Sequence, residues 1–296
     1  MKKSIKYDYQ PYAEAIAAGI GEITSDIGSL KTPDVLRRCF SMMDLTTLRP
    51  EDTPSHVRAF VQKTLGLTKA FPSCPMPSSV CVYPNLVTAA VQARDGSGLS
   101  VTSVAGAFPS SQSFPEVKVL ESRMAVRDGA DEVDIVLPLG AFLSEDYESA
   151  YREICLVREA IDEEAAWQGR GVVLKVILET GVLEDAGKIA IASFLAMEAG
   201  ADFIKTSTGK VAVNATPLAA CVMCECIKKY HEVSGRMVGI KVAGGISTSD
   251  QALGYYNIVS SVLGERWLDR KYFRFGVSRL GNSLLSAIEN KDVTWF

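Results

Sequence analysis

Two lysines stand at the ends of short apolar runs, Lys205 in FIKTSTGK (residues 203–210) and Lys241 in GIKVAGG (residues 239–245). An ammonium group held among apolar side chains is destabilised, so the pKa of such a lysine falls from about 10.4 toward neutrality. A neutral lysine is a nucleophile that forms an imine with a carbonyl compound. The two lysines therefore indicate covalent amine catalysis.

Three further charged side chains, Asp44, Asp134 and Lys175, also lie inside apolar runs. A charge in the close-packed interior of a sheet is costly unless it is paired. Five charges on five different runs neutralise one another only where the runs converge, so we expect them to meet. Asp134, between apolar neighbours, suits proton transfer at the carbon next to an imine. For Lys175 two roles stay open, a structural counter-charge and a part in catalysis.

Glycine-containing loops follow three of the runs and form a second group of candidates. Backbone N–H groups in such loops, together with helix N-termini, bind anions. Each loop alone is equally consistent with a plain turn, but three adjacent loops predict a phosphate site. The loops are Thr208-Gly209-Lys210, Ala243-Gly244-Gly245-Ile246-Ser247-Thr248 and Gly276-Val277-Ser278.

Eight short β-branched runs alternate with helical patterns and must position these residues. Their near-continuous apolarity fits strands buried on both faces, and the alternation predicts a parallel βα architecture. Eight such units predict an α/β fold of the TIM (β/α)8 type, with its active site at the C-terminal mouth. The runs begin near Met42, Ser79, Leu99, Glu132, Val172, Asp202, Val238 and Phe273.

Residues 1–40 precede the first run and contain two helical patterns, at residues 12–23 and 32–40. We interpret them as an N-terminal helical extension that caps the bottom of the barrel or joins a subunit contact. Residues 41–296 then form a single catalytic barrel, because α/β barrels of about 250 residues are one domain. Helix starts are predicted at Ser144, at Thr216-Pro217 and at Ser247.

Composition excludes several classes of function. The formal net charge of −4 gives no basic field for nucleic acid or an anionic membrane. Uncharged stretches are broken by Pro, Gly and Ser, and no apolar segment follows the basic start, so neither a membrane span nor a signal peptide is expected. Seven cysteines without a regular framework favour a reducing compartment, and we predict a cytoplasmic protein.

No metal site is predicted. Cys221, Cys224 and Cys226 fall in one helical stretch without a second ligand pair, so we expect them to be ordinary residues of one helix. The two histidines, His56 and His231, lie in polar helical stretches. A Ser-His-Asp triad or a histidine-ligated metal would need better-placed imidazoles.

The run motifs together resemble the deoxyribose-phosphate aldolase family. They occur in the family's order over about residues 41–280, and the Lys205 and Lys241 motifs are specific in combination. The matching segments are MDLTTL (43–48), VCVYP (80–84), DEVDIV (131–136), LKVILETG (174–181), FIKTSTGK (203–210), VNAT (213–216) and KVAGG (241–245).

The resemblance implies a class I aldolase that needs neither metal nor cofactor. Such an enzyme reversibly cleaves 2-deoxy-D-ribose 5-phosphate to acetaldehyde and D-glyceraldehyde 3-phosphate in deoxyribonucleoside catabolism. It implies that Lys205 forms the imine, Lys241 lowers its pKa and Asp134 relays protons. A homodimer that binds phosphorylated sugars and aldehydes is also implied.

The resemblance extends to the groups that hold the substrate. Hydroxyl-contacting or relay groups are Asp44, Thr46 and Thr208, and with Lys175 they form the predicted substrate-binding set. The predicted phosphate-binding residues are Gly209, Lys210, Gly244, Gly245, Gly276 and Ser278.

The chain also departs from the family pattern. Val242 stands where many members have proline, Arg279 replaces a second serine beside the phosphate site, and the C-terminus ends in Phe296 without the tyrosine of some bacterial members. Two alternatives stay open. They are another Schiff-base sugar-phosphate lyase or transaldolase, and a non-enzymatic phosphometabolite-binding barrel that would need no buried amines.

Overall fold

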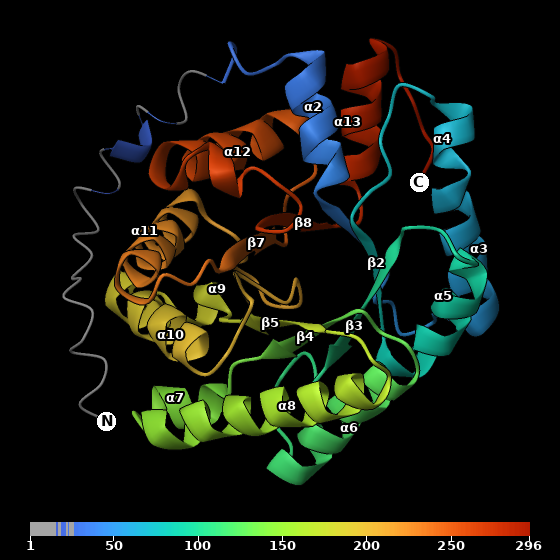
Figure 1. Cartoon of the computed structure of the whole chain (residues 1–296). Coiled ribbons are helices and arrows are strands. Elements are labelled where there is room, and N and C mark those ends of the chain that lie inside the picture. Colours follow the sequence, from blue (N-terminus) through green and yellow to red (C-terminus); the bar gives the residue numbers. More distant parts are fainter. Residues whose placement is uncertain (1–15, 17–18, 22, 24–26) are drawn as a thin grey trace.

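Eight parallel strands close into a barrel whose strand order follows the chain, and β1 pairs with β8 to complete the ring (Figure 1). The computed structural model describes residues 16, 19–21, 23 and 27–296. The strands are β1 (Met43–Thr46), β2 (Ser79–Val82), β3 (Ser100–Ala105), β4 (Glu132–Val136), β5 (Val173–Ile177), β6 (Phe203–Lys205), β7 (Gly239–Ala243) and β8 (Phe273–Val277). The predicted TIM barrel is confirmed, and every strand begins within one residue of its predicted position.

Helices surround the barrel and bury its outer face (Figure 1). The longer helices are α2 (Pro33–Ser41), α3 (Pro54–Leu65), α5 (Val87–Arg94), α6 (Pro115–Arg127), α8 (Tyr147–Trp167), α10 (Ala186–Glu198), α11 (Pro217–Ser234), α12 (Ser249–Leu263) and α13 (Leu280–Glu289). Shorter turns are α4 (Leu67–Ala70), η2 (Pro84–Leu86), α7 (Leu139–Leu143), α9 (Thr180–Leu183) and η3 (Glu265–Trp267). No helix in this described part of the chain is long and apolar enough to cross a membrane.

The helix starts follow from capping side chains. Thr216 Oγ1 accepts a hydrogen bond from the Ala219 N–H at 3.1 Å and Pro217 opens α11, as the sequence predicts. Thr248 and Gln251 form a capping box at the start of α12. Within α11 the three clustered cysteines are buried among apolar neighbours, which confirms their placement in one helix.

Helix α2 is the second predicted helix of the N-terminal extension. It lies in the outer ring beside α12 and α13, where the Arg38 guanidinium donates a hydrogen bond to the Tyr256 hydroxyl at 3.0 Å (Figure 1). The other predicted helix, residues 12–23, falls largely outside the described residues.

The C-terminal tail folds back onto the barrel. The N–H groups of Trp295 and Phe296 both donate to Asn282 Oδ1 at 2.8 Å, and the Asn282 amide donates to the Phe296 carbonyl oxygen at 3.0 Å. The Trp295 ring also meets Phe71 edge-on, with 5.5 Å between the ring centroids. These contacts hold the Phe296 side chain near the mouth of the barrel.

Two glycines offer a test of interior packing. A methyl group at Gly276 in β8 would lie 2.8 Å from the Ala243 Cβ and 2.9 Å from the Lys241 Cε, whereas one at Gly254 in α12 meets nothing within 4 Å. We expect Gly276→Ala to lower the free energy of unfolding by about 1–3 kcal/mol and Gly254→Ala to raise it by about 0.5–1 kcal/mol. Urea denaturation measures both, and equal effects of the two substitutions would contradict this packing.

Candidate active site

Seven charged side chains from six strands meet inside the barrel. None is more than 6% exposed, so these charges must satisfy one another. They are Asp44, Glu132, Asp134, Lys175, Lys205, Lys241 and Arg274. The structure thus brings together all five strand charges that the sequence analysis selected, and adds two.

Asp134 on β4 is the centre of this charge cluster. Its Oδ1 lies 2.8 Å from the Lys175 Nζ, and its Oδ2 lies 2.8 Å from the Nζ atoms of both Lys205 and Lys241. Burial alone would raise the pKa of this carboxyl, but the three lysines hold its pKa well below the usual value. Asp134 is therefore ionised at neutral pH.

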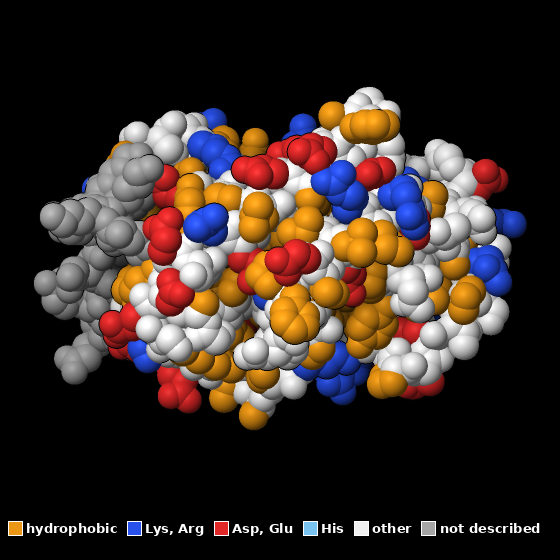
Figure 2. Space-filling view, turned by 90° about the horizontal axis from the view of Figure 1, so that it is seen from below, with side chains coloured by type: hydrophobic (Ala, Val, Ile, Leu, Met, Phe, Trp, Pro, Cys, Tyr) orange, Lys and Arg blue, Asp and Glu red, His pale blue; other side chains and the backbone are white. Residues whose placement is uncertain are grey.

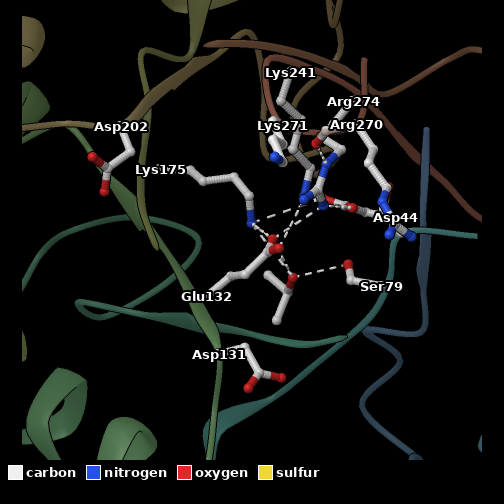
Figure 3. Close-up of polar contacts among 12 residues, drawn as sticks. Asp44, Ser79, Asp131, Glu132, Lys175, Asp202, Lys241, Arg270, Lys271 and Arg274 are labelled. Carbon is white, nitrogen blue, oxygen red and sulfur yellow. Dashed lines mark hydrogen bonds and ion pairs between the residues drawn. The ribbon is translucent and has the colours of Figure 1, made fainter. Parts of the chain in front are cut away.

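Glu132 and Arg274 lie next to Asp44 in the charge cluster. Figure 3 shows the ammonium and guanidinium groups directed at the carboxylates of Asp44 and Glu132. The Arg274 Nη1 lies 2.6 Å from Asp44 Oδ1, and its Nη2 lies 2.8 Å from Glu132 Oε1. Glu132 Oε2 is also 2.5 Å from the Lys175 Nζ. The sequence analysis selected neither Glu132 nor Arg274 as a site residue. Strand alternation would have found Glu132, because it shares a face with Asp134 two residues later.

The cluster holds four cations against three carboxylates, so one cation lacks a counter-charge. Burial lowers the pKa of each lysine, but nearby carboxylates more than offset this for Lys175 and Lys241, whose pKa values rise. The Lys241 Nζ, for example, lies 2.6 Å from Asp44 and 2.8 Å from Asp134. The pKa of Lys205 falls instead, because burial and the neighbouring Lys241 ammonium outweigh its single carboxylate, Asp134. Lys205 is the amine most readily deprotonated.

A cavity of about 570 Å³ lies above this cluster, at the C-terminal ends of the strands. Of the three clustered lysines only Lys205 lines it, while Lys175 and Lys241 are fully buried below. Asp44 and Asp134 also lie beneath the cavity floor. The other predicted site residues line the cavity: Thr46, Thr208, Gly209, Lys210, Gly244, Gly245, Gly276 and Ser278.

The loop after β6 is held by Glu179, a buried residue with a left-handed backbone (φ 55°) that the sequence analysis did not select. Its carboxylate accepts hydrogen bonds from the Thr208 N–H at 3.1 Å and from the Thr208 hydroxyl at 2.5 Å. The Lys210 Nζ donates to the Leu48 carbonyl oxygen at 2.7 Å across the mouth. Gly244 has φ +84°, and a Cβ there would lie 2.5 Å from the Asn214 Oδ1, so glycine is required.

Further cationic side chains line the cavity beside Lys210: Arg49, Lys63 and Arg279. Within the described residues no aspartate or glutamate lines it. His56 lies in α3, as the sequence predicts, yet it faces the cavity and its Nδ1 is 2.8 Å from Asp52 Oδ1. Phe296, brought there by the folded tail, completes the wall. The cavity therefore suits an anionic ligand that carries a carbonyl group toward Lys205.

The charge balance predicts a pH effect. Lys241→Met removes the surplus positive charge, so Lys205 is retained as the counter-ion of Asp134 and its pKa rises. Only the neutral amine attacks a carbonyl, so the rate of imine formation with an aldehyde falls as the pH drops below the pKa of Lys205. We expect this acid limb of the pH–rate profile to move to higher pH by about one unit or more. Borohydride trapping measured across a pH series follows this limb.

Glu132→Gln provides the opposing control, since it removes a carboxylate without touching Lys205. The surplus of positive charge then grows, and the acid limb is expected to move to lower pH. Shifts of both variants in the same direction would refute the charge-balance argument.

Comparison with known proteins agrees with this geometry. A model of the DeoC/LacD aldolase family matches residues 40–255. A Caenorhabditis elegans protein with the provisional name deoxyribose-phosphate aldolase is 39% identical over 277 residues, which are 93% of this chain and 88% of that protein.

Two solved structures are similar over most of both chains. A protein from Coccidioides immitis, again provisionally named a deoxyribose-phosphate aldolase, is 26% identical with a TM-score of 0.68, and the match covers 86% of each chain. The tetrameric deoxyribose phosphate aldolase of Aeropyrum pernix is 25% identical with a TM-score of 0.66, over 90% of this chain and 96% of that one. The resemblance seen in the strand motifs is confirmed: this chain belongs to the DeoC/LacD family of aldolases.

Proposed function

We propose that this aldolase reversibly cleaves 2-deoxy-D-ribose 5-phosphate to acetaldehyde and D-glyceraldehyde 3-phosphate, in the catabolism of deoxyribonucleosides. The observation that carries the proposal is Lys205, the single amine of the buried cluster that lines a cavity with cationic walls. Its pKa is lowered, which suits attack on a carbonyl, and the cations suit a phosphate. A barrel that only binds phosphometabolites would not require these buried lysines.

In the proposed reaction Lys205 attacks the aldehyde carbon, C1, of the open-chain sugar, and loss of water gives a protonated imine. The C3 hydroxyl loses its proton, the C2–C3 bond breaks, and its electron pair moves toward the imine nitrogen. Glyceraldehyde 3-phosphate, carrying C3 to C5, leaves an enamine of acetaldehyde. Protonation at C2 and hydrolysis then release acetaldehyde and restore the amine.

Asp134 is our candidate for the proton relay. Its carboxylate is 2.8 Å from the Lys205 nitrogen and is fully buried beneath the cavity floor. Because Asp134 does not itself line the cavity, a water molecule between its carboxylate and the C3 hydroxyl would carry the proton. Lys241 and Lys175 act in this proposal through Asp134, as fixed positive charges.

For the phosphate we propose the loops after β6, β7 and β8. Gly209, Gly244 and Gly245 all have positive φ, between 80° and 84°, and backbone N–H groups in such turns suit phosphate oxygens. Lys210 and Ser278 would add side-chain contacts. Arg279, which also lines the cavity, would supply a charged donor where a second serine is usual in the family.

We further propose a cytoplasmic homodimer. The seven free cysteines support a reducing compartment. The Aeropyrum pernix relative is described as a tetramer, so assembly occurs among similar proteins.

Reductive trapping tests the role of Lys205. After incubation with acetaldehyde and borohydride, peptide mass spectrometry is expected to find the added ethyl group on Lys205 and not on Lys175 or Lys241. Lys205→Ala should lose both the label and at least about 10³-fold of the cleavage rate, because the covalent step is removed. A label on a different lysine of the cluster would sink the proposed mechanism.

Substrate comparison tests the phosphate site. Lys210→Ala is expected to raise KM for 2-deoxyribose 5-phosphate by about tenfold or more and to change cleavage of free 2-deoxyribose little, because one charge-assisted contact is lost. Lys188→Ala, on the exposed surface of α10, is the matched control. Equal losses with the phosphorylated and the free sugar would argue against Lys210 as a phosphate ligand.

A further inference from the structure

His56 is a titratable side chain of the cavity wall that the proposed reaction does not use. It lies in the first turn of α3, where its backbone N–H donates to the Thr53 hydroxyl at 3.2 Å. His56 lines the cavity and 46% of its side chain is exposed, so a ligand can reach the ring. Its Nδ1 lies 2.8 Å from Asp52 Oδ1, and no described residue bonds to Nε2. Nε2 is therefore the ring nitrogen that remains for a ligand.

The Asp52 carboxylate fixes this imidazole. The Asp52 side chain is fully buried, and its Oδ2 accepts hydrogen bonds from the Thr47 hydroxyl at 2.7 Å and from the Arg49 N–H at 2.9 Å. Burial raises the pKa of Asp52, but these hydrogen bonds and His56 more than offset it, so the pKa lies below its usual value. An ionised carboxylate only accepts hydrogen bonds, so the His56 Nδ1 carries a proton. The carboxylate also favours a positive charge on the ring.

The wall that carries His56 is joined to the proposed phosphate site. Asp52 bonds to residues 47 and 49, and the Leu48 carbonyl oxygen between them accepts a hydrogen bond from the Lys210 Nζ at 2.7 Å. The imidazole and the Lys210 ammonium are thus held by the same three-residue segment after β1. A phosphate bound at Lys210 would lie beside this wall.

The charges around His56 favour an anion. Acidic and basic side chains are interspersed on the outer surface, as Figure 2 shows for the face of α6 and α8, whereas the described part of the cavity wall has basic side chains and no acidic one. Asp52 is covered and already bonded, so it presents no free carboxylate to a ligand. The titratable and charged groups in contact with this wall or lining the cavity with it are Asp52 and Arg49 after β1, Tyr83 after β2, Lys63 of α3, Lys205 and Lys210 of the β6 end and Arg279 after β8.

We propose that His56 is a proton-linked ligand of the substrate phosphate: the imidazole takes up a proton from solvent as the phosphate binds, and its Nε2–H donates to a phosphate oxygen. A protonated imidazole donates from both nitrogens, here to Asp52 on one side and to the anion on the other. Such a charge-assisted contact is stronger than a neutral one, and histidine changes its charge between about pH 5 and 8. The inference rests on the proposed phosphate site and makes its affinity highest at low pH.

Sulfate binding tests the proposal, because sulfate resembles a phosphate dianion and keeps its charge over the range in which histidine titrates. Calorimetry of the full chain with sulfate should give a dissociation constant about tenfold higher near pH 8 than near pH 5.5, and proton uptake on binding near pH 7. His56→Gln should lose most of this pH dependence and proton uptake. His231→Gln, which changes the other histidine, in α11 and away from the cavity, should keep both. Lys205 is present in every variant, so its titration cancels in the comparison. Unchanged pH dependence in His56→Gln, or no sulfate binding by the unchanged protein, would overturn the proposal.

Preference for the phosphorylated sugar tests the same contact during turnover. Near pH 6, His56→Gln is expected to lower about tenfold the ratio of kcat/KM for 2-deoxyribose 5-phosphate to kcat/KM for free 2-deoxyribose, because one charge-assisted contact is lost. Equal proportional losses with the two sugars would place His56 at the reacting carbons and refute its role as a phosphate ligand. Calorimetry needs no turnover, so a failure of the proposed reaction, seen as a missing imine on Lys205, is distinguishable from a failure of this inference.

Discussion

The carboxylate of Asp134 between three lysines is the interaction on which the rest of the site depends. Buried charges are tolerated only when they are paired, and here each strand of the cluster supplies a partner for another. The register of the barrel makes this possible, since Asp134 lies beside Lys175 across β4 and β5, and Lys205 lies beside Lys241 across β6 and β7. The strand register that closes the barrel therefore also pairs the buried charges of the site.

Much of this architecture follows from local sequence. Strand starts were predictable because each run is apolar on both faces and is bounded by turn residues. The partners of the buried lysines were only partly predictable. Arg274 stands in a short aromatic run that gives no local sign of its partners, and its guanidinium reaches Asp44 of β1 and Glu132 of β4. The cavity wall was harder still, because the tail that carries Phe296 is placed by Asn282 through tertiary contacts that no local pattern encodes.

Lys205 and Lys241 show why sequence alone cannot divide the roles of two similar lysines. Each ends or occupies an apolar run, and they are neighbours across β6 and β7. Their difference arises from distant strands. Gly276 of β8 leaves space for the Lys241 side chain, whose nitrogen lies between Asp44 and Asp134. Lys205 reaches one carboxylate and opens on the cavity. The number of counter-charges, which is a property of the closed barrel, separates the two pKa values.

The two layers of the site use positive charge in opposite ways, yet their effects reinforce each other. In the buried layer, four cations against three carboxylates leave Lys205 as the amine that most readily loses its proton. In the cavity, Lys210, Arg279 and the other cations have no carboxylate among the described lining residues, so their charge is available to an anionic ligand. The pKa of Lys205 is lowered by burial and by the Lys241 ammonium of the buried layer. Attraction of an anionic ligand and activation of the amine therefore rest on two neighbouring groups of positive charge, one in the cavity wall and one beneath it.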